Sequence, residues 1–530
     1  MKKRKAMKAV FKLYAMDQML LMPRSYDEMI PEDHLVRVVN SAVERIDLAN
    51  LLSEYAGGGT SSYHPQMMVK VLVYAYCQKI YSSRKIAAAL RENIYFMWLS
   101  GGNTPDFRTI NLFRGVRMKA VIGEVFGAVV DYLVAAGYVK LENLFVDGSK
   151  IEADANKHKV VWAKRKERYE KRVKEQIQEL LQEIENANDA EQAEYGEKDL
   201  EEMGGSGTPD LNGERLKQTI DELNQRLREK RQPPEQEKKA RQALKKLETD
   251  CLPRLQKYEE QTRILDGRNS YSKTDPDASC QRMKEDRGAK RPWAKPAYNV
   301  QIGTEGQFIV STSVHKGGSD TPCLIPHLNG MSAKLRSQLK NVVADAAYGS
   351  EENYDYLKRH KLGSYLKYNT FYQDTHHYRN PDILRQHQFR SEHFQYDESN
   401  DQFLCPNKRR LSYRFTSQSK TDNGYLSTRR HYECETCTDC PLKSQCTKAK
   451  DNRLIQVSFQ LREFRRQARE NLTSEQGQQL RAQRSVEVET VFADLKHNMG
   501  FRRFQLRGHA KVTTEWTLLC IAHNMRKLAV

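Results

Sequence analysis

Two short runs of apolar residues, each ending in an aspartate, stand out along this chain of 530 residues. Residues 144–146 precede Asp147 and Gly148, and residues 342–344 precede Asp345. Apolar runs of this length that are rich in β-formers predict buried strands. Two such strands side by side would bring both carboxylates to one sheet edge. Taken singly, a strand-end aspartate is more often part of a turn.

Apolar residues recur at spacings of three and four between His34 and about Gly137, which predicts a series of helices. Val36, Val39 and Val43 form the first such face. Short helices with tight turns fit a helix-turn-helix DNA-binding domain, and they fit an ordinary helical bundle as well. In a DNA-binding domain the following basic side chains would face phosphates: Arg84, Lys85, Arg91, Arg108 and Arg114.

A long charged segment, dominated by Glu, Lys, Gln and Arg, extends from about residue 158 to residue 263. A glycine-rich stretch at 204–209 divides it. The two halves carry apolar residues at heptad-like spacing, at Val173, Ile177, Leu180 and Ile184 and at Leu216, Ile220, Leu223 and Leu227. This pattern predicts an inserted helical hairpin or short coiled coil that serves as an arm or a dimerisation element.

Alternating residues at 298–303 and 308–314 predict a β-hairpin, and a helix then leads into the strand that ends at Asp345. This order of elements predicts an α/β fold with a mixed sheet. The predicted domains are a helical N-terminal domain (1–137), a core in three parts (138–157, 264–364 and 461–530), the charged helical insert (158–263) and a basic, cysteine-containing insert (365–460).

The last predicted helix, residues 485–499, carries a third acid. Its apolar positions would pack on the sheet, and Glu489 and Lys496 are seven residues apart, which places them on nearly the same helix face. Glu489 could then join Asp147 and Asp345, with Lys496 reaching toward a phosphate. Taken alone, Glu489 is an ordinary solvated acid. Arginines interleaved with aromatic residues follow as a candidate clamp on the DNA backbone, namely Arg502, Arg503 and Arg507.

The overall charge favours a nucleic-acid partner. Lysine and arginine number 87 against 69 acidic residues, for a formal net charge of +18. An excess of this size is typical of proteins that neutralise phosphates. No run approaches eighteen apolar residues and the N-terminus lacks a signal-peptide pattern, so we expect a cytoplasmic protein with no membrane role.

Ten cysteines are too few for a disulfide scaffold in a chain of this length. Four of them cluster, at Cys434, Cys437, Cys440 and Cys446. In a reducing compartment such a cluster suits a structural Zn²⁺ site, with free thiols or a disulfide knot as the alternative. The CxxCxxC spacing is tight for one tetrahedral ion, and either His431 or Cys405 could be a ligand instead.

Three carboxylates on two strands and a helix suit two Mg²⁺ ions, because hard cations prefer oxygen ligands. In a two-metal site one ion activates water or a 3′-hydroxyl while the other stabilises the leaving oxygen. Asp147, Asp345 and Glu489 are therefore candidates for phosphodiester cleavage and transfer.

Five stretches together resemble the bacterial insertion-sequence transposases of the DDE class: FVDGSKIEADANKHK, SKTDPDAS, KPAYNVQI, VVADAAYGSEEN and EVETVFADLKHNMGFRRFQLRG. The resemblance implies an RNase H-like core and a catalytic triad of Asp147, Asp345 and Glu489 with Mg²⁺ or Mn²⁺. It also implies binding of terminal inverted repeats and target DNA by a homodimer or higher multimer, in a bacterial cytoplasm and on the nucleoid when active.

One departure concerns how the DNA end is gripped. Many related enzymes have the pattern Tyr-x2-Arg-x3-Glu-x6-Lys around the catalytic glutamate. In this chain Ala482 and Ser485 take the Tyr and Arg positions. Arg484, one residue from the Arg position, is a candidate DNA contact in its place. Two other functions stay open: a metal-dependent nuclease that does not join strands, and an inactive or repurposed transposase that only binds DNA.

Overall fold

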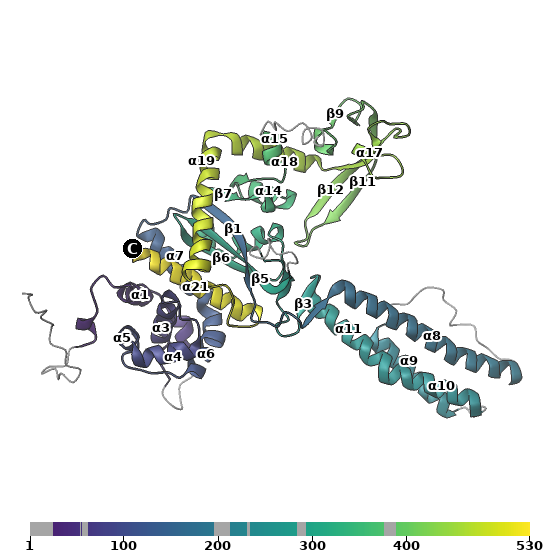
Figure 1. The fold of residues 1–530 in the computed structure, drawn as a ribbon, viewed down its shortest axis with the longest axis horizontal. Coiled ribbons are helices and arrows are strands. Elements are labelled where there is room, and N and C mark those ends of the chain that lie inside the picture. The colour runs from purple at the N-terminus through teal and green to yellow at the C-terminus, as the bar shows by residue number, and fades with distance from the viewer. Residues whose placement is uncertain are drawn as a thin grey trace, which may run out of the picture.

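The computed structural model describes residues 25–53, 55, 62–195, 212–229, 234–283, 293–375 and 388–529. The basic residues at the start of the predicted N-terminal domain and the glycine-rich stretch at 204–209 lie outside them. Figure 1 shows four parts: a group of N-terminal helices, a central sheet, a projecting arm of long helices and a second sheet. Within the described residues no helix is long and apolar enough to cross a membrane.

The N-terminal part is helical, as predicted. The face formed by Val36, Val39 and Val43 is buried, and the side chains of Asn93 and Asp106 accept backbone N–H bonds that begin two of the helices. The helices are α1 (Leu35–Glu44), α2 (Ala49–Ser53), α3 (Pro65–Cys77), α4 (Ser83–Glu92), α5 (Ile94–Ser100), α6 (Phe107–Leu112), the π-helical turn η2 (Phe113–Arg117) and α7 (Met118–Ala135). Both α3 and α7 pack against the last helix, α21 (His509–Leu528).

The central sheet is mixed and confirms the α/β class. Strand order is β4-β5-β1-β7-β8, with β6 paired to β5. Strand β1 is parallel to β7 and antiparallel to β5. The bounds are β1 (Asn143–Glu152), β4 (Ser279–Gln281), β5 (Lys295–Glu305), β6 (Phe308–His315), β7 (Asn341–Ala344) and β8 (Gly363–Leu366). Short helices α12 (Leu324–Asn329), α13 (Ala333–Arg336) and α14 (Glu351–Arg359) connect them, and α21 packs on β6.

Strand β1 is longer than predicted. We expected it to end at Asp147, but it continues to Glu152 because its far half remains paired with β5, from Gly148↔Gln301 to Glu152↔Ala297. Only the parallel pairing with β7 stops at Val146↔Ala344. Asp147 therefore lies inside a strand, at the point where one of its two neighbours ends.

The charged segment forms long helices that project from the sheet (Figure 1). They are α8 (Ala163–Tyr195), α9 (Gly213–Glu229), α10 (Pro234–Lys246), the π-helical turn η3 (Leu247–Cys251) and α11 (Leu252–Leu265). Val173, Ile177, Leu216 and Ile220, from the predicted apolar seams, are buried in a core of their own. Antiparallel pairing of β2 (Val160–Trp162) with β3 (Ser270–Ser272) joins this part to the core.

The second insert contains an antiparallel five-stranded sheet that we did not predict. Its order is β13-β12-β11-β10-β9, from β9 (Gln395–Asp397), β10 (Gln402–Leu404), β11 (Arg410–Lys420), β12 (Leu426–Cys434) and β13 (Leu454–Val457). Phe403, Leu411 and Tyr432 centre its small core. Helices α15 (Phe371–Thr375) and α17 (Lys443–Cys446) are short, and α18 (Phe459–Thr473) and α19 (Glu475–Arg484) return the chain to the central sheet.

Candidate active site

The two predicted aspartates lie next to each other because β1 and β7 are parallel neighbours in register. Val146 pairs with Ala344, and Asp147 and Asp345 follow directly. Asp147 is held with its side chain 12% exposed, and its Oδ1 accepts the Gly148 N–H at 2.9 Å. Asp345 Oδ1 accepts the Ala347 N–H at 2.9 Å, which begins a short helical turn and orients a more accessible carboxylate.

The third acid comes from a helix with two wide turns. Residues 475–498 form α19, the π-helical turn η8 (Ser485–Glu489), α20 (Thr490–Ala493) and a second π-helical turn, η9 (Asp494–Asn498). The predicted core face is confirmed, since Val488, Val491, Phe492 and Leu495 are buried. Glu489, at the end of η8, has a side chain that is 64% exposed.

One guanidinium links all three acids. Arg484 Nη2 lies 3.4 Å from Asp147 Oδ1 and 3.9 Å from Asp345 Oδ2, and its Nη1 lies 3.8 Å from Glu489 Oε1. The Arg484 side chain is only 10% exposed, and its Nε has no hydrogen-bond partner. Two strands and one helix therefore bring the three predicted carboxylates around the Arg484 guanidinium.

The π-helical turn accounts for the displaced arginine of the sequence. In an α-helix residues four apart lie one above the other, whereas in a π-helix residues five apart do so. Because Ser485–Glu489 is π-helical, Arg484 faces Glu489 from five residues away. The extra residue in the motif is thus absorbed by the wider turn, a feature that occurs frequently at functional sites.

Behind the aspartates lies a polar network that sequence reasoning missed. Gln301, fully buried on β5, donates from Nε2 to Asn299 Oδ1 at 3.0 Å and to Asp320 Oδ1 at 3.1 Å. The Tyr348 hydroxyl, in the turn after Asp345, donates to Gln301 Oε1. The pKa of Tyr348 is raised by burial and by the nearby carboxylates of Asp320, Asp147 and Asp345. The sequence signal for this network was the stretch KPAYNVQI, which contains Asn299 and Gln301.

Carboxylate oxygens are suitable ligands for Mg²⁺ or Mn²⁺. Within the described residues, however, no group of three or more His, Cys, Asp or Glu side chains is arranged to hold a metal ion as it stands. The chemistry of the donor set fits a divalent cation, while Arg484 lies among the oxygens that such an ion would use.

Lys496 is less accessible than the prediction of a phosphate contact implies. It is buried, 9% exposed, whereas the Glu489 side chain is exposed. Lys496 lies in the second π-helical turn, η9, which shifts the helical register between the two residues. Arg502 is close by and bonds to Lys496 O and His497.

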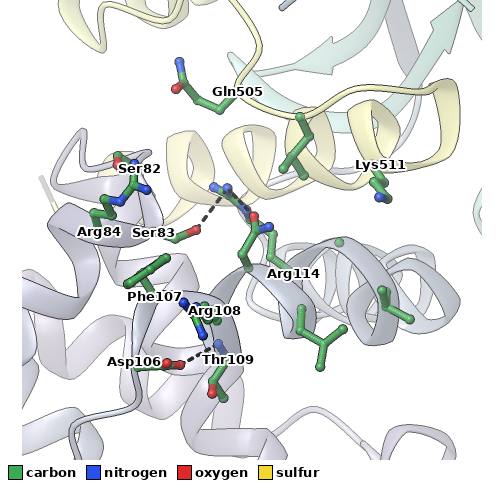
Figure 2. A pocket seen from close by; sticks show the side chains of 15 residues that line it. Ser82, Ser83, Arg84, Asp106, Phe107, Arg108, Thr109, Arg114, Gln505 and Lys511 are labelled. Atoms are coloured by element: carbon green, nitrogen blue, oxygen red, sulfur yellow. Dashed lines mark hydrogen bonds between the residues drawn. The ribbon is translucent and has the colours of Figure 1, made fainter. Parts of the chain in front are cut away.

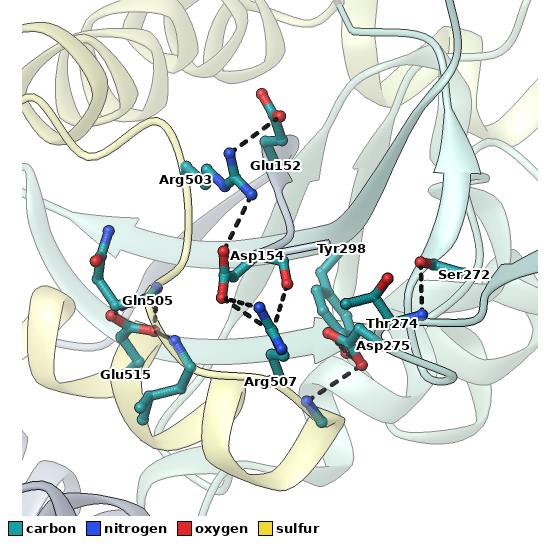
Figure 3. Close-up of polar contacts among 12 residues, drawn as sticks. Glu152, Asp154, Ser272, Thr274, Asp275, Tyr298, Arg503, Gln505, Arg507 and Glu515 are labelled. Atoms are coloured by element: carbon teal, nitrogen blue, oxygen red, sulfur yellow. Dashed lines mark hydrogen bonds and ion pairs between the residues drawn. The ribbon is translucent and has the colours of Figure 1, made fainter. Parts of the chain in front are cut away.

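The other two arginines of the predicted clamp make ion pairs within the protein (Figure 3). Arg503 Nη2 lies 3.0 Å from Asp154 Oδ1, and Arg507 Nη2 lies 2.9 Å from Asp154 Oδ2. Both remain about half exposed. The loop that carries them is thereby fixed to the end of β1.

A basic hollow of about 780 Å³ lies between the N-terminal helices and residues 505–511 (Figure 2). Exposed Arg84 and Arg108 flank the Phe107 ring, with their guanidinium carbons 5.0 and 5.7 Å from its centroid. Lys511 lies across the hollow from Arg108, and an adjoining hollow extends to Arg507. Lys85 is exposed on α4 next to Arg84.

Arg114 is wrongly assigned by the sequence to a phosphate contact. It is 2% exposed and donates to the Tyr76 hydroxyl and to Tyr81 O. Buried Glu515 on α21 lies beside it, accepts N–H bonds from Gln505 and Leu506, and has a pKa raised by burial. Arg114 thus links segments of the N-terminal part to one another, and its charge favours the ionised form of Glu515 on α21.

Five cysteines line one small hollow beside the second sheet, the four predicted ones and Cys405. Three accept N–H bonds at sulfur: Cys405 from Arg409 N at 3.3 Å, Cys437 from Arg453 N at 3.3 Å and Cys440 from Asn407 Nδ2 at 3.5 Å. Buried Cys434 instead donates to Thr436 O, and burial raises its pKa to about 12. These thiols, like the acids, are not closed around a metal ion.

Two family models match the chain. Residues 24–115 match a transposase domain (DUF772), and residues 404–529 match a transposase DDE domain. The second match includes Glu489, whereas Asp147 and Asp345 lie outside both. No curated protein and no solved structure matches. The two matches, at opposite ends of the chain, support an insertion-sequence transposase of the DDE class.

Proposed function

We propose that this protein binds the terminal inverted repeats of its insertion sequence and catalyses metal-dependent strand cleavage and strand transfer. The observation that carries the proposal is the convergence of Asp147, Asp345 and Glu489 within 4 Å of one guanidinium. A mixed sheet with parallel β1 and β7 flanked by antiparallel β5 and β6 supports an RNase H-like core. Joining two ends requires at least two copies, so the active form is a dimer or larger multimer on DNA.

The residues of the site have separate roles. Asp147, Asp345 and Glu489 would hold two Mg²⁺ ions, which supply activation of water or of a 3′-hydroxyl and stabilisation of the leaving oxygen. The backbone N–H groups of Gly148 and Ala347 orient the two aspartates. The exposed Glu489 side chain reaches the centre from the solvent side, where the substrate arrives.

The basic hollow supports binding of the DNA backbone. Arg84, Arg108 and Lys511 are exposed donors that suit phosphates, and Phe107 between the two arginines offers an apolar contact to a sugar or base. Replacing Lys511 by Ala should reduce the slope of log K against log salt by about 1 if it neutralises one phosphate. Lys171→Ala, an exposed lysine on α8, is the matched control and should leave the slope unchanged.

The experiment that tests the function is a cleavage and joining assay with duplexes from the ends of the element, in Mg²⁺ or Mn²⁺. Wild type should cut and join, and Asp345→Asn should bind the ends but do neither. Asp131→Asn, which alters a surface ion pair with Lys334, should behave as wild type. Cutting without joining would indicate a nuclease, and binding without cutting by wild type would indicate a DNA-binding remnant.

The cysteine hollow supports a structural Zn²⁺ in the second insert. The ligands we propose are Cys405, Cys437, Cys440 and Cys446. The first three accept N–H bonds at sulfur. They also lie close enough to Cys446 to influence its pKa, which burial raises. Cys434 also interacts with Cys437 and Cys405, but we place it outside this set because its thiol donates to Thr436 O. Zinc in the purified protein should be lost in Cys405→Ser and kept in Cys434→Ser. The reverse result would restore the set of Cys434, Cys437, Cys440 and Cys446.

A further inference from the structure

Arg484 is an unusual neighbour for a group of metal-binding acids. Its Nη2 lies between the two aspartates, near Asp147 Oδ1 and Asp345 Oδ2, and its Nη1 faces Glu489. These are the oxygens that a divalent cation would need. A guanidinium and a metal ion cannot both occupy this small space, so the positive charge of Arg484 competes with the ion.

Without a cation, three carboxylates this close would repel one another strongly in a partly buried site. Arg484 places a positive charge within 4 Å of all three and holds them together. Its contacts are loose, however. All three N···O distances exceed the 2.7–2.9 Å of a good charge-assisted hydrogen bond, and Nε is buried without a partner.

A phosphate would satisfy this side chain better. A guanidinium binds a phosphate with two parallel N–H···O bonds, and it prefers this geometry to a set of single long contacts. In the proposed function a DNA phosphate must come to these acids, since its ester bond is the one that is cut. The arriving strand therefore offers Arg484 a better partner at the same place.

We propose that Arg484 is an exchangeable counter-ion of the active site. In the free protein it holds the three acids and opposes metal binding, and on a DNA end it moves to a phosphate and releases the acids to the metal ions. Metal affinity and DNA binding are then coupled, which restrains hydrolysis in the absence of an end. This inference rests on the proposed function. Arg484 acts here as a positioning residue.

The test is Mn²⁺ binding to the full-length protein, measured by electron paramagnetic resonance of free Mn²⁺, with and without a duplex carrying the element's end. For wild type, the duplex should raise Mn²⁺ affinity about tenfold, within the usual range of coupling between two sites. Arg484→Gln should bind Mn²⁺ about tenfold more tightly than wild type without DNA and should gain little from DNA. Duplex alone and duplex with Asp147→Asn correct for ions held by the DNA.

Arg466→Gln is the matched control. Arg466 also bridges two carboxylates with one guanidinium, Glu463 at 2.6 Å and Glu470 at 2.7 Å, but on the exposed face of α18. It should behave as wild type in both conditions. Circular dichroism melting checks that each variant is folded, and the wild-type comparison needs no variant at all.

Two results would overturn the inference. One is wild-type Mn²⁺ affinity that is the same with and without the duplex. The other is a folded Arg484→Gln that binds Mn²⁺ no more tightly than wild type. If wild type binds no Mn²⁺ at the site even with DNA, the proposed metal-dependent function fails as well, so the two failures are distinguishable.

Discussion

Replacing Gly148 by alanine should destabilise the core around Asp147. A Cβ at this position would lie 2.3 Å from Gln301 Nε2 and 2.6 Å from Asp320 Oδ1, closer than real Cβ contacts. The Gln301 amide is the end of a flexible side chain, but it is held by bonds to Asn299, Asp320 and Tyr348. The new methyl group must therefore displace a bonded network.

The magnitude follows from those bonds. Moving the amide breaks up to three buried hydrogen bonds, each worth about 1 kcal/mol net, for about 2–3 kcal/mol in total. That value agrees with the roughly 1–3 kcal/mol that overpacking of a core usually costs. Because the same network lies beside Asp147, cleavage activity should fall with stability.

The assay is equilibrium urea denaturation of Gly148→Ala beside a matched control, Gly127→Ala. Gly127 is inside α7, and no atom lies within 4 Å of an added Cβ there. The control should be stabilised by about 0.5–1 kcal/mol, as expected for Gly→Ala inside a helix. Gln301→Ala removes the obstructing amide. In a Gln301→Ala background, Gly148→Ala should therefore lower the free energy of unfolding by less than it does in wild type. A Gly148→Ala protein as stable as wild type would refute the reasoning.

The hydrogen bond from His523 Nδ1 to Asp494 Oδ2 is the largest cause of the lowered pKa of Asp494. The ionised Asp494 therefore stabilises the folded protein above the unfolded pKa of 3.8, and this stabilisation is lost as pH falls through the folded pKa. The difference in free energy of unfolding between wild type and Asp494→Asn should therefore shrink on acidification below about pH 4, measured by urea denaturation. Arg114→Met should cost about 3–5 kcal/mol in the same assay, because buried Glu515 loses its counter-charge. Adding Glu515→Gln to Arg114→Met should recover part of that loss, and no recovery would argue against the pairing.

The features that sequence reasoning predicted are those with a local signal. Short runs of β-formers ending in Asp147 and Asp345 indicated two strands, and parallel neighbours in register necessarily bring such residues together. The helix that carries Glu489 was visible from its apolar positions, since Val488, Val491 and Leu495 fit an α-helical face. The three acids that lie around Arg484 could therefore be predicted from the sequence.

What could not be predicted depends on contacts between distant segments. The π-helical turn at Ser485–Glu489 leaves the apolar pattern intact, so nothing in the periodicity shows that Arg484 faces Glu489. The Gln301 network joins three separate segments through the sheet topology. Arg114 looked like a surface cation, because its burial depends on the packing of η2 among the N-terminal helices and α21.

An Asp147→Cys variant tests whether Asp147 holds a catalytic metal ion, as we propose. A thiolate is a softer ligand than a carboxylate and binds Mn²⁺ better than Mg²⁺. If Asp147 is a metal ligand, Asp147→Cys should be inactive in cleavage and joining with Mg²⁺ and partly restored with Mn²⁺, whereas Asp147→Ala should stay inactive in both. Two results would contradict a metal-binding role for Asp147, provided that wild type is active. One is full activity of Asp147→Cys in both metals, and the other is no activity of this variant in either metal.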